Sequence, residues 1–60
     1  MIMSFNFEQE ELVLHVLGDP DQKGMVIARL DSGGVHHYLI SWGVDACSWH
    51  LAAELRKADV

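Results

Sequence analysis

The sequence predicts a mainly β fold, a small barrel of four or five short strands that ends in a short helical turn. Two stretches of strand-like composition, residues 25–30 and 35–42, flank a polar turn that contains Gly33 and Gly34. Glycine enters the φ > 0 region without a Cβ penalty, so alternating stretches on either side of a Gly-Gly pair predict a β-hairpin. The rest of the chain is expected to wrap or close this hairpin.

The length of 60 residues predicts a single domain that covers residues 1–60. A chain of this size buries only about 60% of the surface that its unfolded form exposes, so its core is small. Half of the residues are hydrophobic and 22% are charged, which is typical of globular proteins. The small core favours an assembly component, in which a partner covers part of the remaining apolar surface.

The charge and cysteine content exclude several classes of protein. The formal net charge is −5 and the chain has one cysteine, Cys47, so an intrachain disulfide scaffold is excluded. Residues 1–4 do not begin a basic segment followed by a long apolar core, and no apolar run approaches the roughly 18 residues of a membrane span. We therefore expect a soluble, cytoplasmic protein without a membrane partner.

The segment of residues 6–17 fits two interpretations. As a helix it would be capped by Asn6 and would end at Gly18. As a strand, residues 12–17 would place alternate apolar side chains on opposite faces. The alternation favours the strand, although short apolar runs discriminate weakly between the two.

The remaining segments complete the predicted fold. Residues 18–24 contain a proline between two aspartates and predict an exposed loop, and residues 47–50 predict one more brief strand. Residues 51–57 are mostly good helix formers and predict the helical turn. Phe5 and Phe7 are expected to plug the barrel or to form a short extra strand. Short strands with tight turns suggest an SH3-like barrel, because closing the sheet removes free edges.

The C-terminal half resembles a known family. Residues 38–43 (Tyr-Leu-Ile-Ser-Trp-Gly), residues 48–49 (Ser-Trp) and residues 54–55 (Glu-Leu) are similar to the chromo-domain pattern Y-L-V-K-W-x-G, T-W-E and a closing N-L. The resemblance covers about residues 24–55, and Tudor and KOW modules share parts of it. Residues 23–26 are similar to the glycine and valine step of KOW modules. Small bacterial and phage barrels carry comparable patterns.

The resemblance implies the barrel and a recognition edge near Trp42, which matches one residue of the chromo-domain aromatic cage. The next cage position is occupied by Val44, which is not aromatic, so the resemblance does not extend to a methylated-lysine ligand. Trp42 lies at a strand end beside a turn and is therefore the better binding candidate of the two tryptophans. Trp49 is expected to fill the core.

The leading functional hypothesis is a non-enzymatic module that binds a protein partner, without a cofactor. The binding surface is expected to be an apolar edge formed by Trp42, Tyr38 and Met25, with Asp19 and Asp21 in an acidic rim. A single-domain module of this kind would most naturally be a phage or bacterial accessory protein, an assembly component or a homo-oligomer. This placement rests on size and fold analogy.

A second hypothesis is a KOW- or Tudor-like regulator that binds nucleic acid. It would require the four basic residues to converge on one side of the domain: Lys23, Arg29, Arg56 and Lys57. Four basic groups under a net negative charge supply little phosphate affinity, so nucleic acid is the less favoured partner.

A third hypothesis is a zinc-stabilised module that uses His36, Cys47 and His50. His36 and His37 are adjacent on a predicted strand and must point to opposite faces, so one ion cannot take both. The remaining three ligands lack the paired cysteines of most structural zinc sites, and we predict no metal site. The spacing of Cys47 and His50 also allows a nucleophile pair, but catalysis needs an orienting group and a pocket as well, so we predict no enzyme activity.

Overall fold

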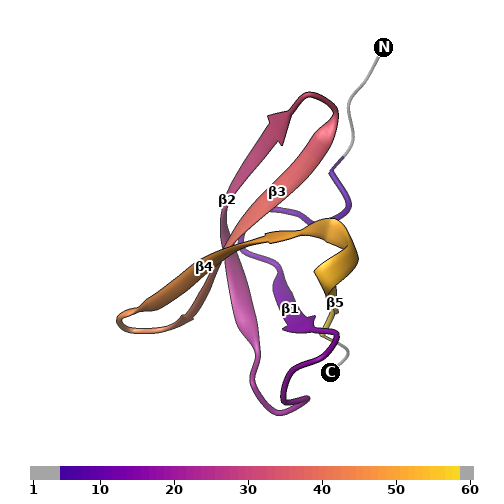
Figure 1. Cartoon of the computed structure of the whole chain (residues 1–60). Helices are drawn as coiled ribbons and strands as arrows, with labels where there is room; N and C mark the ends of the chain where they lie inside the picture. The colour runs from indigo at the N-terminus through magenta and orange to yellow at the C-terminus, as the bar shows by residue number, and fades with distance from the viewer. Residues whose placement is uncertain (1–4, 59–60) are drawn as a thin grey trace.

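The computed structural model describes residues 5–58, which form one five-stranded antiparallel sheet in the order β4-β3-β2-β1-β5 (Figure 1). This architecture confirms the mainly β prediction. The elements, in chain order, are β1 (Leu12–His15), β2 (Gly24–Ser32), β3 (Val35–Gly43), β4 (Ala46–Leu51), the 3-10 helix η1 (Ala52–Glu54) and β5 (Leu55–Lys57).

The predicted hairpin is confirmed as β2 and β3. Ser32 pairs with Val35 across the turn, and Gly33 and Gly34 have φ angles of 60° and 84°. These positive angles explain the glycine pair, because a residue with a Cβ atom has a higher conformational energy at positive φ. The Asp31 side chain accepts a hydrogen bond from the N–H of Gly34 at 3.0 Å and closes the turn.

The strand interpretation of residues 12–17 is confirmed for Leu12–His15, which forms β1, whereas Val16 and Leu17 lie in a turn. β1 lies between β2 and β5, and both Val13 and Leu14 are buried instead of alternating. Phe7 belongs to the hydrophobic core and Phe5 packs against it. These two aromatic residues therefore cover the core face of the sheet and do not form an extra strand. Their side chains cover Tyr38, with Phe7 at 5.1 Å between ring centroids.

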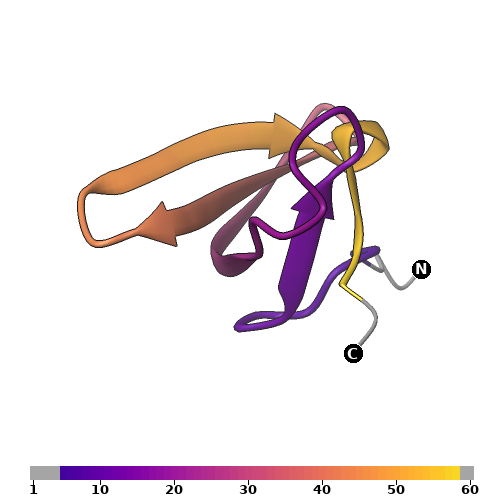
Figure 2. The same cartoon turned by 90° about the horizontal axis from the view of Figure 1, so that it is seen from below.

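The predicted helical turn over residues 51–57 is correct only for Ala52–Glu54. Leu55–Lys57 is strand β5, which pairs with β1 over its whole length. The helix-forming preference of these residues is overridden because the ladder satisfies the backbone and buries Leu55 in the core. In Figure 2, β5 (yellow) lies beside β1 (purple), although the two strands are far apart in the sequence.

The predicted closed barrel is wrong for the described residues, because the sheet stays open. β5 has three residues and forms its ladder with β1, and β4 forms its ladder with β3, so these two strands are the edges of the sheet. None of the helices in residues 5–58 is long and apolar enough to cross a membrane.

The core lies on one face of the sheet and is formed by six buried residues: Phe7, Val13, Val26, Tyr38, Ile40 and Leu55. Tyr38, predicted at the binding edge, is fully buried, and its hydroxyl oxygen accepts the N–H of Asn6 at 2.8 Å. Trp49, predicted in the core, is 51% exposed. The register explains the reversal, because Trp49 pairs with Leu39 and His50 pairs with Tyr38.

Candidate functional site

The register divides strands β2, β3 and β4 into two faces. Cross-strand partners in an antiparallel sheet project from the same face. Ser48 pairs with Ile40 and His50 pairs with Tyr38, so these side chains lie on the core side, which we call the inner face. Trp49 projects from the opposite side, which we call the outer face.

A cavity of about 330 Å³ opens at the end of the inner face. Its lining residues are His15, Gly18, Asp19, Gln22, Trp42, Ser48 and His50. The loop between β1 and β2 forms one wall, and the Gln22 side-chain amide donates to the Trp42 carbonyl at 2.8 Å. This bond fixes the loop against β3.

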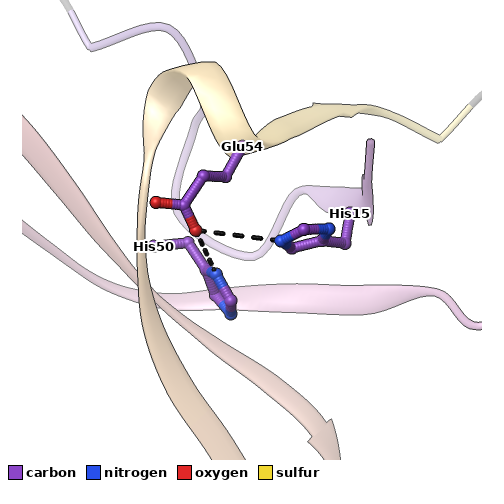
Figure 3. A group of neighbouring side chains, drawn as sticks. All are labelled: His15, His50 and Glu54. Atoms are coloured by element: carbon purple, nitrogen blue, oxygen red, sulfur yellow. Dashed lines mark hydrogen bonds and ion pairs between the residues drawn. The ribbon is translucent and has the colours of Figure 1, made fainter. Parts of the chain in front are cut away.

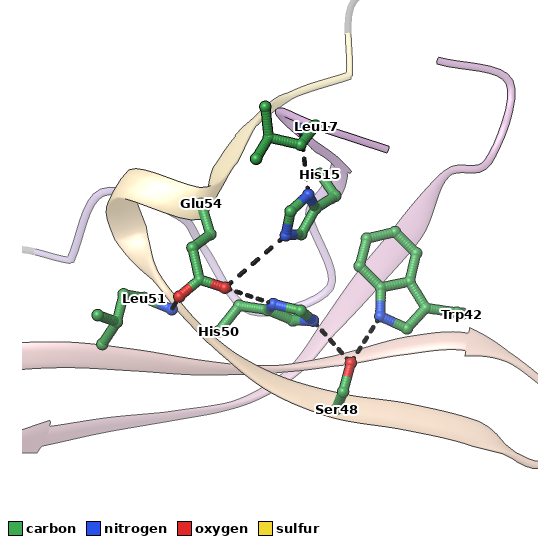
Figure 4. A network of polar contacts seen from close by, with 7 residues as sticks. All are labelled: His15, Leu17, Trp42, Ser48, His50, Leu51 and Glu54. Atoms are coloured by element: carbon green, nitrogen blue, oxygen red, sulfur yellow. Dashed lines mark hydrogen bonds and ion pairs between the residues drawn. The ribbon is translucent and has the colours of Figure 1, made fainter. Parts of the chain in front are cut away.

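A chain of hydrogen bonds runs along one side of the cavity (Figure 4). The indole N–H of Trp42 donates to Ser48 Oγ at 2.9 Å, and Ser48 Oγ lies 2.6 Å from His50 Nε2. His50 Nδ1 lies 2.8 Å from Glu54 Oε1. Glu54 also accepts the N–H of Leu51 through Oε2 at 3.4 Å. The chain therefore connects β3, β4 and η1 through side chains alone.

His15 approaches the same carboxylate from β1 (Figure 3). Its Nε2 lies 3.8 Å from Glu54 Oε1, and its ring meets the His50 ring edge-on at 5.1 Å between centroids. The His15 Nδ1 accepts the N–H of Leu17 at 3.2 Å. Two imidazoles and one carboxylate from three segments thus converge at one point.

The pKa of Glu54 is lowered below its ordinary value of 4.5. The main cause is the hydrogen bond from the His50 side chain, followed by the N–H of Leu51. Both donors stabilise the ionised carboxylate more than the neutral acid. Glu54 is therefore an anion at neutral pH.

Ser48, His50 and Glu54 stand in the order of a hydrolase triad, with nucleophile, base and acid in sequence. The Trp42 N–H donates to Ser48 Oγ and withdraws electron density from the oxygen that would attack a substrate. The same bond ties Ser48 to β3. We interpret the chain of bonds as a device that orients His50 rather than one that activates Ser48.

The predicted binding edge does not form one surface. Trp42 and Asp19 meet at the cavity, whereas Tyr38 is in the core. Asp21 is exposed and donates its N–H to the Asp19 carboxylate at 2.9 Å, but it does not line the cavity. Met25 pairs with Ser41 and lies on the outer face, so it and Trp42 point away from each other.

The residues considered for zinc are also separated. Cys47 and His50 are three positions apart on β4 and therefore face opposite sides of the sheet. His36 lies beside Asp31, with 4.0 Å between Nε2 and Oδ2. The odd spacing of Cys47 and His50 could have excluded their pairing from sequence, but the approach of His15 carries no local sequence signal.

The outer face presents apolar side chains in adjacent rows. Leu39 lies between Ala28 and Trp49, and the next row places Leu30 and Leu51 on either side of His37. Leu30 and Trp49 are each 51% exposed. Five large apolar side chains lie on the outer face: Met25, Leu30, Leu39, Trp49 and Leu51.

Comparison with known proteins gives no matching family model, no matching curated protein and no matching solved structure. The function is therefore inferred from the outer face and the cavity.

Proposed function

We propose that this chain is a small non-enzymatic module that binds a protein partner through its outer face. The observation that supports this function best is the half-exposed Trp49, which pairs with Leu39 across the strands. Leu30 and Leu51 lie in the neighbouring cross-strand row on the same face. Contiguous exposed apolar side chains on a small domain mark interaction surfaces. Tryptophan is also among the residues that contribute most to binding energy at protein interfaces.

The shape of the surface favours a macromolecular partner over a small ligand. The outer face is built on three paired strands and carries its apolar side chains at fixed cross-strand positions. Small ligands bind in concave sites, whereas a sheet face of this kind fits another protein surface. The ladder holds the anchors in place, so little conformational entropy is lost on binding.

The charge of the chain favours a different protein over a second copy. Each copy carries a formal net charge of −5, so two copies repel one another at low ionic strength. A partner with an apolar patch and a basic rim would gain attraction where a second copy meets repulsion. We therefore assign the outer face to a heterologous, basic protein.

Nucleic acid is a weaker candidate partner. Arg29 lies 3.5 Å from Glu8 and Lys57 lies 3.7 Å from Glu11, so two of the four basic side chains already face carboxylates. Arg29 also sits over the Phe5 ring at 4.7 Å. These contacts reduce the positive charge available for phosphates.

The test compares three variants with the wild-type protein as bait in a native lysate. Trp49→Ala removes the proposed anchor, Val44→Ala trims a fully exposed side chain in the β3–β4 turn, and Trp42→Phe changes the inner face. A protein recovered by all baits except Trp49→Ala is then purified and titrated. Circular dichroism confirms that each bait is folded.

For the purified partner, Trp49→Ala is expected to weaken binding by about 2 kcal/mol or roughly 30-fold in Kd. Val44→Ala and Trp42→Phe are expected to bind as the wild type does. Equal recovery by Trp49→Ala and the wild type would contradict the proposed surface. A wild-type dimer in sedimentation equilibrium that Trp49→Ala dissociates would replace the heterologous partner with a second copy.

A further inference from the structure

We propose that His15, His50 and Glu54 form a binding site for a zinc-type divalent metal ion. The site lies on the inner face beside the cavity and is independent of the protein-binding outer face. It differs from the sequence-based zinc hypothesis, because only His50 is common to both ligand sets. Imidazole nitrogen and carboxylate oxygen are ligands that zinc uses in proteins.

The spacing of the donor atoms fits one ion after small movements. One atom from each residue lies within 4.8 Å of the other two, with 2.8 Å from His50 to Glu54 and 3.8 Å from His15 to Glu54. Ligand atoms on one tetrahedral zinc are separated by roughly 3.3 Å, from bond lengths of about 2.0–2.2 Å. Glu54 must therefore move by about half an ångström away from His50 and toward His15. The two imidazole nitrogens lie within 4.8 Å of each other, and the rings must turn to bring them to the same spacing. Its side chain is 42% exposed and has room for that shift.

The backbone holds the three ligands in register. His15 pairs with Leu55 in the ladder between β1 and β5, and the next N–H along β1, that of Val16, donates to the Glu54 carbonyl at 2.9 Å. His50 is fixed by its pairing with Tyr38 in the core. The backbone positions of the ligands are thus fixed before any ion binds, which reduces the ordering that binding must impose.

The surrounding hydrogen bonds suit metal binding by His50. With Nδ1 on the ion, the Nε2–H of His50 would donate to Ser48 Oγ at the observed 2.6 Å, and the Trp42 N–H holds Ser48 in place. Histidine ligands of metals usually donate their other N–H to such a partner. Coordination would replace the hydrogen bond between His50 Nδ1 and Glu54 Oε1 with a bond from each atom to the ion.

Metal binding by His15 would remove one weak hydrogen bond. Coordination through Nε2 places the proton on Nδ1, which now accepts the N–H of Leu17 at 3.2 Å. That contact must break. Leu17 is 89% exposed, so water can replace the lost partner of its N–H.

The cavity supplies the remaining coordination position. His15 and His50 belong both to the ligand set and to the cavity lining. An ion held by these two rings and Glu54 would therefore have an open position toward the cavity, where water would bind. Three protein ligands and one water are typical of zinc sites that remain accessible.

The experiment titrates the full chain with Co²⁺ at neutral pH and follows the visible absorption of tetrahedral cobalt, which Zn²⁺ should then abolish. Titration calorimetry should give one ion per chain. In NMR spectra, Zn²⁺ should shift the imidazole signals of His15 and His50 and leave those of His36 and His37 in place.

Glu54→Gln and His15→Ala are each expected to weaken Co²⁺ binding at least 10-fold. The matched control is His37→Ala, which removes an imidazole from the outer face and should bind as the wild type does. Absence of both cobalt absorption and imidazole shifts in the wild-type protein at millimolar metal would overturn the proposal. Equal loss in Glu54→Gln and His37→Ala, or full binding by Glu54→Gln, would overturn it as well.

Discussion

Gly24, the first residue of β2, provides a sharp test of the packing between the core and the cavity. A Cβ atom at this position would lie 2.4 Å from Ile40 Cγ2 and 2.7 Å and 2.8 Å from two atoms of the Trp42 ring. Ile40 is fully buried and Trp42 is fixed by Ser48, so neither can move freely. Gly24→Ala is therefore expected to lower the free energy of unfolding by about 1–3 kcal/mol, the usual cost of overpacking.

The assay is thermal and urea denaturation followed by circular dichroism. For a domain of this size, each 1 kcal/mol corresponds to about 4–8 °C in Tm. Gly43→Ala is the matched control, because Gly43 ends β3 and a Cβ there meets nothing within 4 Å. Gly43→Ala lowers the conformational entropy of the unfolded chain as much as Gly24→Ala does, but its Cβ atom does not clash with a neighbour. A Gly24→Ala protein within about 0.5 kcal/mol of Gly43→Ala would refute the packing.

Three further predictions concern stability. Tyr38→Phe removes the acceptor of the Asn6 N–H and should cost about 1 kcal/mol in urea denaturation; an unchanged midpoint would contradict the bond. Gly34→Ala imposes a Cβ on a φ of 84° and should cost about 1 kcal/mol in the same assay. The pKa of Glu54 is lowered mainly by the His50 hydrogen bond, so the ionised carboxylate stabilises the folded state. This stabilisation is fully present above the ordinary carboxyl pKa and is lost as the pH falls through the lowered pKa of Glu54. In chelator, the stability difference between wild type and Glu54→Gln should shrink over that acidic range, and a pH-independent difference would contradict this reasoning.

Local features explain the part of the fold that was predictable from the sequence. The β2–β3 hairpin is encoded by Gly33 and Gly34, whose positive φ angles are available at little cost only to glycine. The alternation that places Tyr38 and Ile40 on one side of β3 is also visible in the sequence, and both are buried. These features depend on neighbours along the chain.

The incorrect predictions depend on contacts between distant segments. Residues 55–57 prefer a helix in isolation, but the ladder with β1 and the burial of Leu55 decide their conformation. Whether Trp49 or His50 shares a face with Tyr38 depends on the register of β4 against β3, which the sequence of β4 does not specify. The exposure of Trp49 was therefore missed.

The candidate site was predictable only in part for the same reason. Trp42 and Asp19 were singled out as binding residues, and both line the cavity. His15 and Glu54 were not, because they are 39 positions apart and meet only through the β1–β5 pairing that places η1 beside the end of β1. Nothing in either local sequence signals that contact.

The most direct test is the accessibility of the two tryptophans, because the proposed function requires Trp49 to be exposed on the outer face, and the same register places Trp42 on the inner face beside the cavity. Iodide quenching of fluorescence is measured on Trp42→Phe, which retains Trp49, and on Trp49→Phe, which retains Trp42. The structure predicts strong quenching and red-shifted emission for Trp49, and weaker quenching with blue-shifted emission for Trp42. Equal quenching of the two, or stronger quenching of Trp42, would contradict the assignment of the faces.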